Sequence, residues 1–154
     1  MHQGGKNYRI TLLEQVFEAT NEDELADLTK RVRSRGYYPY MTNPDEIAEL
    51  EKNPDRISEI FMTEVLKVVQ QWMDLADKKL EGTDMKIYCS PGNDDADEVD
   101  AVVRSSRRVI LVEGQVTQLD DHHEMIASGW SNRTPWDTHR EEDEDQLKVR
   151  YEAM

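Results

Sequence analysis

The sequence has few of the features that mark secreted, membrane or disulfide-bonded proteins. Its 154 residues include one cysteine, Cys89, which excludes a disulfide framework and a cysteine zinc site and is typical of a reducing compartment. No apolar run approaches the about 20 residues that a transmembrane helix needs. The first six residues carry no apolar stretch of the kind found in signal peptides. We therefore expect a cytoplasmic protein with no membrane partner.

Positive charge is also scarce. Thirty-three acidic side chains outnumber 19 basic ones, which gives a formal net charge of −14. This charge repels phosphate backbones, so we expect no binding to nucleic acid. An excess of carboxylate is also what keeps a protein soluble in a saline cytoplasm. Hydrophobic residues make up 37% and charged residues 34% of the chain, and the two kinds are interspersed, as in a globular protein.

The first part of the chain, residues 1–81, is expected to form a hairpin followed by helices. Residues 8–13 and 15–20 carry the β-branched and aromatic side chains of two short strands. A helix is expected from Thr20 or Asn21, both good N-caps, to Gly36.

Two further helices are expected to open at proline. One begins at Pro44 and is short; the other runs from Pro54 to about Leu80. In the long helix, apolar residues recur at steps of three and four, which favours a face packed in the core. They are Ile57, Phe61, Val65, Val68, Trp72 and either Leu75 or Ala76.

After Gly82 the pattern changes to short strands and helices in alternation. Strands are expected at 85–89, 109–112, 115–119 and 123–129, and helices at 96–104 and 141–152. The fold class is therefore expected to be α+β, with a sub-domain boundary near Gly82.

The segment that carries chemistry is Pro-Gly-Asn-Asp-Asp at 91–95, between a predicted strand and a predicted helix, where α/β folds place ligand sites. Gly92 allows a sharp turn, Asn93 offers a neutral oxygen, and Asp94 and Asp95 offer carboxylates. Such oxygen donors suit a divalent ion. The same residues are also typical of a plain turn before a helix, and the residues by themselves leave both readings open.

The strand, this loop and the helix resemble the third motif of the calcineurin-like metallophosphoesterases, usually Gly-Asn-His-Asp or Gly-Asn-His-Glu. The similarity runs from about Asp84 to about Arg140 and includes Gly-Trp-Ser-Asn-Arg-Thr-Pro-Trp at 129–136. It implies an αββα sandwich of mixed sheets. Residues 82–154 would form part of that metallophosphoesterase core, and residues 1–81 a hairpin and helical insertion or cap.

The resemblance also implies the chemistry: hydrolysis of a phosphate monoester or diester by a water that two divalent ions activate, the ions being Mn, Fe, Mg or Zn. By this resemblance, Asn93 is a metal ligand, and Asp95 is a carboxylate that supports the ligands without itself binding the metal. Asp94 stands where most members carry a catalytic histidine that contacts the phosphate and protonates the leaving group. A carboxylate there is repelled by phosphate unless it is protonated or paired with metal.

Two residues further along the chain are candidates for contact with the substrate phosphate. Asn132 and Arg133 follow a predicted strand, and an arginine can bind a phosphate through two parallel hydrogen bonds. A solvated loop explains both residues equally well.

The family's site also needs Asp-x-His, Gly-Asp and Gly-His-x-His motifs. The chain has no Gly-Asp and no His-x-His, and its three Asp-x-His matches, at 120–122, 121–123 and 137–139, all follow Asn93, in the wrong order for the family. We therefore expect an internal piece of a longer phosphoesterase that is inactive or nearly so alone. The alternative is a non-catalytic acidic protein-interaction module. The sequence specifies neither the substrate nor the oligomeric state.

Overall fold

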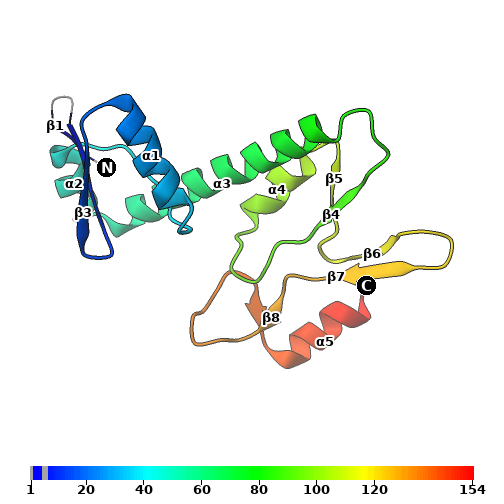
Figure 1. Cartoon of the computed structure of the whole chain (residues 1–154). Coiled ribbons are helices and arrows are strands. Elements are labelled where there is room, and N and C mark those ends of the chain that lie inside the picture. The colour runs from blue at the N-terminus through cyan, green and yellow to red at the C-terminus, as the bar shows by residue number, and fades with distance from the viewer. Residues whose placement is uncertain (1, 5–6) are drawn as a thin grey trace. The chain divides into compact units, whose positions relative to one another are not determined.

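The computed structural model describes residues 2–4 and 7–154, with side chains from Asn7 onward. Helices and small sheets are mixed along the chain, which confirms the expected α+β class (Figure 1). The described strands form one three-stranded sheet and three two-stranded sheets. The chain divides into two compact units, Met1–Val65 and Leu66–Met154, which are described in turn. The compositional boundary near Gly82 stays a prediction.

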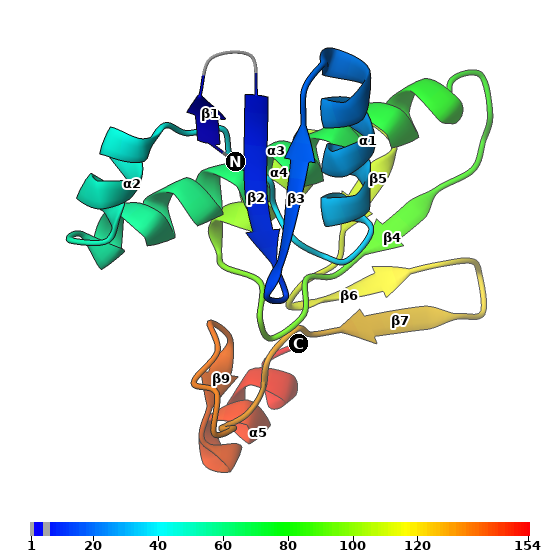
Figure 2. The same cartoon turned by 60° about the vertical axis from the view of Figure 1, so that its left-hand side comes forward.

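The first unit is built on an antiparallel sheet in the order β1-β2-β3 (Figure 2). The predicted hairpin is present: Leu12 pairs with Gln15, and the two residues between them have positive φ, 49° at Leu13 and 64° at Glu14. A two-residue hairpin loop needs this backbone because its twist matches that of the strands. The strands are β1 (His2–Gly4), β2 (Asn7–Leu12) and β3 (Gln15–Ala19).

Helix α1 (Glu22–Arg33) begins where its cap residue predicts. Asn21 Oδ1 accepts a hydrogen bond from the Glu24 backbone N–H at 2.9 Å, which satisfies one of the unpaired donors of the first turn. Leu28 and Val32 of the helix are buried with three residues of the sheet. Among the described residues, the buried core cluster of this unit is Tyr8, Leu12, Ala19, Leu28 and Val32. The same capping by Asn43 starts α2 (Pro44–Leu50).

Helix α3 (Pro54–Lys79) has the expected length, but most of its apolar stripe is not core. Only Val69 and Met73 are buried on this helix, and neither belongs to the stripe. The expectation of a packed stripe was wrong for four large side chains that are exposed. They are Ile57, Phe61, Trp72 and Leu75.

The second unit contains a parallel β-α-β arrangement of β4 (Ile87–Cys89), α4 (Glu98–Arg104) and β5 (Val109–Leu111). Asp77 of α3 holds the turn between α4 and β5, because its carboxylate accepts hydrogen bonds from the Ser106 hydroxyl at 2.5 Å and from the backbone N–H groups of Arg107 and Arg108. These donors, the Ser106 hydroxyl first, lower the pKa of Asp77.

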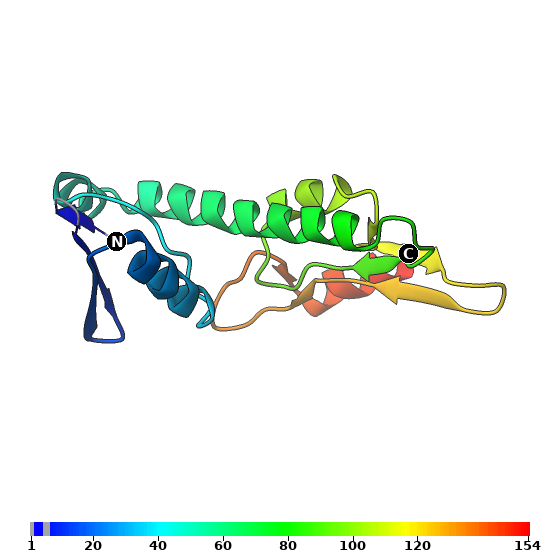
Figure 3. The same cartoon turned by 45° about the horizontal axis from the view of Figure 1, so that its top comes forward.

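Two more strand pairs and a helix complete this unit. β6 (Gln115–Gln118) and β7 (Glu124–Ala127) form an antiparallel hairpin (Figure 3). β8 (Ser131–Asn132) and β9 (Glu141–Glu142) are parallel, and α5 (Glu144–Glu152) ends the unit. The prediction that the last helix starts at Glu141 was wrong: Glu141 lies in a strand pair, and Asp143 is the N-cap. Among the described residues, no helix is both long and apolar enough to cross a membrane.

The chain just after β7 passes so close to the loop of residues 90–97 that residue 129 has to be glycine. A Cβ built on Gly129 would lie 2.2 Å from the Pro91 carbonyl oxygen, which is far inside van der Waals contact. Gly92, the glycine that the sequence singled out, does not have positive φ, and a Cβ there would meet only Asp95 Oδ2, at 3.7 Å.

We predict that Gly129→Ala lowers the free energy of unfolding by about 1–3 kcal/mol, because the backbone of residue 91 must move. Gly92→Ala is the matched control and is expected to cost less than about 0.5 kcal/mol. Urea unfolding followed by tryptophan fluorescence measures both. Equal losses in the two variants would contradict the assignment of the tight contact to Gly129.

Candidate functional site

The loop of residues 90–97 lies at the carboxyl end of β4 and leads into α4 (Figure 1). Asp95 closes it: its Oδ2 accepts a hydrogen bond from the Gly92 N–H at 2.7 Å, and its own N–H donates to the Gly92 carbonyl at 3.2 Å. The carboxylate of Asp95 is therefore used inside the loop, where it fixes the backbone on either side of Asn93.

Asn93 is half-buried and is held by its amide nitrogen. Its Nδ2 donates to Ser131 Oγ and to Thr138 Oγ1, both at 3.2 Å. Among residues 7–154, no hydrogen bond is made to its Oδ1. The side chain thus keeps an amide oxygen with its lone pairs available at the end of a parallel strand, which is a suitable single ligand for a hard divalent ion.

The other residues expected at the site are not brought to Asn93 by hydrogen bonds. Asp94 is exposed and makes no hydrogen bond or ion pair within the described chain. Asn132 donates to the neighbouring Arg133 carbonyl at 3.4 Å. The Arg133 Nε donates to Asp143 Oδ1 at 2.7 Å, and this hydrogen bond raises the pKa of Arg133. The expected phosphate contact of Arg133 would first have to compete with Asp143.

Arg140 is the residue of this region that the sequence did not reveal. Its side chain is 2% exposed, and its Nη2 lies 2.7 Å from Asp100 Oδ1. The guanidinium also donates to the carbonyls of Asp95 at 2.8 Å and Ala96 at 3.2 Å. Its backbone N–H donates to the Asn93 carbonyl at 2.9 Å. One buried arginine therefore holds both the loop and the first turn of α4.

Glu141 is a second buried charge that the sequence did not reveal, since the pattern put it in a helix. It is 9% exposed, and its Oε1 accepts hydrogen bonds from the hydroxyls of Thr134 at 2.5 Å and Thr138 at 2.6 Å. Its Oε2 accepts from the Thr134 backbone N–H at 2.8 Å. These donors, with Thr134 the largest contributor, lower the pKa of Glu141 to about 2. Only the three-dimensional fold places Thr138 between Asn93 and Glu141.

Glu113 lies on the other side of the loop. Its Oε2 accepts hydrogen bonds from the Gly129 N–H at 2.6 Å and the Ser90 hydroxyl at 2.9 Å. Its Oε1 is buried and has no partner among the described residues. Glu113 thus connects Gly129, just after β7, to the loop. Among the described residues it makes no hydrogen bond to Asn93.

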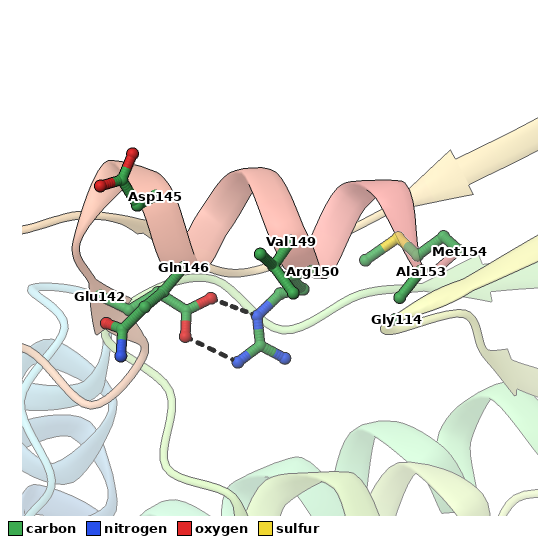
Figure 4. Close-up of a pocket in the computed structure, with 8 residues that line it drawn as sticks. All are labelled: Gly114, Glu142, Asp145, Gln146, Val149, Arg150, Ala153 and Met154. Atoms are coloured by element: carbon green, nitrogen blue, oxygen red, sulfur yellow. Dashed lines mark hydrogen bonds and ion pairs between the residues drawn. The ribbon is translucent and has the colours of Figure 1, made fainter.

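A groove of about 670 Å³ runs along α5 (Figure 4), and none of the predicted site residues lines it. On its wall, Arg150 forms two hydrogen bonds to Glu142, at 2.5 and 2.9 Å, and lies 3.9 Å from the centre of the Trp130 ring. The hydrogen bond to Glu142 raises the pKa of Arg150. Among the residues that line the groove, Glu142 offsets the charge of Arg150.

The part of the chain that the structure describes contains no group of three or more His, Cys, Asp or Glu side chains that could hold a metal ion. The Asp-x-His matches at 120–122 and 121–123 do not form such a group. Asp120 accepts hydrogen bonds from the His123 ring at 2.8 Å and from the His122 N–H at 2.8 Å in an exposed turn. Asn93 therefore fits a metal as one ligand, without a complete set around it.

Comparisons with protein-family models, with curated proteins and with solved structures returned no match.

We predict that Arg140→Met lowers the free energy of unfolding by about 3–5 kcal/mol, because Asp100 is left without its buried partner. The matched control is Arg133→Met, which removes an exposed pair and is expected to cost less than about 1 kcal/mol. Urea unfolding measures both variants. Equal costs would show that the buried guanidinium does not hold the loop.

We also predict that Glu141 makes the protein sensitive to acid. The folded protein keeps this group ionised down to about pH 2, whereas the unfolded chain protonates it near pH 4.5. Its stabilising effect is therefore complete above pH 4.5 and is lost as the pH falls from 4.5 towards 2.

Urea unfolding between pH 5 and pH 2.5 tests this. Glu141→Gln is expected to lose less stability over this range than the wild type does, while the exposed neighbour variant Glu144→Gln keeps the wild-type dependence. A Glu141→Gln profile parallel to that of the wild type would refute the prediction.

Proposed function

We propose that this chain contributes the Asn93 loop to a calcineurin-like metallophosphoesterase, which hydrolyses phosphate monoesters or diesters. The observation that carries the proposal is the orientation of Asn93 at the carboxyl end of β4. Both of its donated hydrogen bonds leave through the amide nitrogen, to Ser131 and Thr138, and its amide oxygen has no partner among the described residues. The two hydrogen bonds of the NH₂ group tie the loop to the 131–138 segment, and the interpretation as a plain turn leaves the amide oxygen without a role.

The donor set fits one ligand of a two-metal centre. When bound, the two divalent ions (Mn, Fe, Mg or Zn) would activate the attacking water and offset charge on the phosphate. Asn93 would supply one neutral oxygen, and Asp95 would keep the loop closed around it through Gly92. Asp94 is exposed and, by the resemblance, would stand where most members of the family carry a catalytic histidine. Under this proposal the centre needs further ligands beside Asn93, because the described residues contain no group of three or more His, Cys, Asp or Glu side chains that could hold a metal ion.

The two-stranded parallel sheet supports the finer fold proposal, an αββα sandwich. Parallel strands are normally covered on both faces. Here Ile110 of β5 lies on the face opposite the buried Val109 and Leu111 and is 37% exposed. A further layer over that face, as the sandwich implies, would bury it.

The alternative, a non-catalytic interaction module, is favoured by a different observation. Trp72 and Leu75 of α3 are 59% and 53% exposed, and large exposed apolar side chains often mark protein contact surfaces. An interaction module gives Asn93 no role as a metal ligand. The two proposed functions therefore predict different effects of a metal ion on the NMR signals of the loop.

We predict that Mn²⁺ selectively broadens the backbone NMR signals of residues 92–95 in the ¹⁵N-labelled chain, because Asn93 Oδ1 offers a rigid ligand beside the Asp94 carboxylate. Asn93→Ala is expected to abolish the selective broadening, and Asn132→Ala to preserve it. Broadening confined to other acidic segments would contradict the metal-ligand assignment and favour the interaction module.

Hydrolysis is tested on the protein expressed from its complete reading frame, with p-nitrophenyl phosphate as substrate. Turnover is expected to depend on Mn²⁺ and to fall about 10- to 100-fold or more in Asn93→Ala. The control Glu144→Gln, an exposed change outside the candidate site, should stay near wild type. Turnover that is unchanged by removing either Mn²⁺ or the Asn93 side chain would refute the proposed function.

A further inference from the structure

A continuous chain of hydrogen bonds connects Asn93 to the buried carboxylate of Glu141. Asn93 Nδ2 lies 3.2 Å from Thr138 Oγ1, and Thr138 Oγ1 lies 2.6 Å from Glu141 Oε1. The residues come from the loop after β4, from the segment between β8 and β9, and from β9. No spacing in the sequence joins them.

The direction of this chain follows from counting protons. An ionised carboxylate has no proton to donate, and a threonine hydroxyl has one. Thr138 therefore gives its proton to Glu141 and can only accept from Asn93. An amide oxygen cannot donate, so the group of Asn93 that faces Thr138 has to be its NH₂.

Ser131 imposes the same direction independently. Its hydroxyl donates to the Asn132 carbonyl at 3.1 Å, so that it too can only accept from Asn93 Nδ2, at 3.2 Å. Both protons of the NH₂ group are then used. The Oδ1 atom, on the other branch of the planar amide group, is left without a partner among the described residues.

We propose that Glu141 is a positioning residue: through Thr138, its negative charge fixes the Asn93 amide so that oxygen, and not nitrogen, is presented beyond the end of β4. That this oxygen serves as a metal ligand rests on the proposed function. The orientation itself does not, since it follows from the hydrogen bonds alone.

The charge of Glu141 is required, and not merely its shape. In Glu141→Gln, the Thr134 N–H can only donate, so it draws the glutamine oxygen to the former Oε2 position. The glutamine NH₂ then faces Thr138, which becomes an acceptor and turns its own proton toward Asn93. Thr138 then favours the reverse orientation of the Asn93 amide, with the oxygen toward Thr138, whereas Ser131 still favours the original one, so the amide is no longer held in a single orientation.

The test observes the Asn93 side-chain NH₂ directly by NMR in the metal-free, ¹⁵N-labelled chain, its signals being assigned by their loss in Asn93→Asp. In the wild type we expect two well-separated proton signals that exchange slowly with water. In Glu141→Gln we expect exchange to become about tenfold faster or more, with a changed shift, while the backbone amides of α4 keep their protection.

Glu142→Gln is the matched control, because it removes the neighbouring carboxylate, which pairs with Arg150 and has no link to Asn93. It should leave the Asn93 NH₂ signals as in the wild type. Thr138→Val should release the NH₂ group, and Thr138→Ser, which restores the hydroxyl, should hold it again. This pair decides the question if Glu141→Gln does not fold.

Unchanged Asn93 NH₂ exchange in Glu141→Gln or in Thr138→Val would overturn the proposal, as would an equal effect of Glu142→Gln. The measurement needs no metal, so its failure is separate from that of the phosphoesterase reading. An anchored Asn93 amide combined with no selective Mn²⁺ broadening would refute the metal ligand and leave the positioning role of Glu141 in place.

Discussion

The second unit depends on a single buried guanidinium. Arg140 is placed among the carbonyls of Asp95 and Ala96 and the carboxylate of Asp100, and its side chain is almost completely withdrawn from water. Taking a charge out of water costs several kcal/mol, which is offset only when partners with good geometry replace the solvent. The loop carbonyls have to point inward to supply those partners. The path of the loop on both sides of Asn93, and the start of α4, follow from that requirement.

The acidic side chains do not all have the same role, although the net charge counts them alike. Most carboxylates are solvated or lie at helix starts, whereas a few accept several hydrogen bonds and hold distant segments together. Asp77 fixes the turn before β5, Glu113 ties Gly129 to Ser90, and Glu141 gathers Thr134 and Thr138. In each case backbone N–H or hydroxyl donors take the place of water around the charge, which is how a buried carboxylate is stabilised.

Elements with local signals were predictable. Side-chain alternation, caps and the fixed φ of proline predict the hairpin, the asparagine-capped helices, the helix opening at Pro54 and the strand that ends at Cys89. The last helix was placed too early, because an acidic run is also typical of a first turn, and Glu141 is instead held extended by threonine hydroxyls. The apolar residues of α3 that include Phe61 and Trp72 have helical spacing, but both side chains are exposed. Spacing alone does not determine whether another element covers that face of the helix.

The sequence by itself determined the α+β class, the position of the Gly92–Asp95 loop between a strand and a helix, and an asparagine at its centre. Only the tertiary structure decided which atom of Asn93 is free and which residues hold it. Ser131, Thr138, Arg140 and Glu141 lie about 40 residues or more along the chain from the loop, so no local pattern relates them to it. The same holds for Gly129, whose need for glycine comes from the approach of Pro91, a contact that exists only after folding.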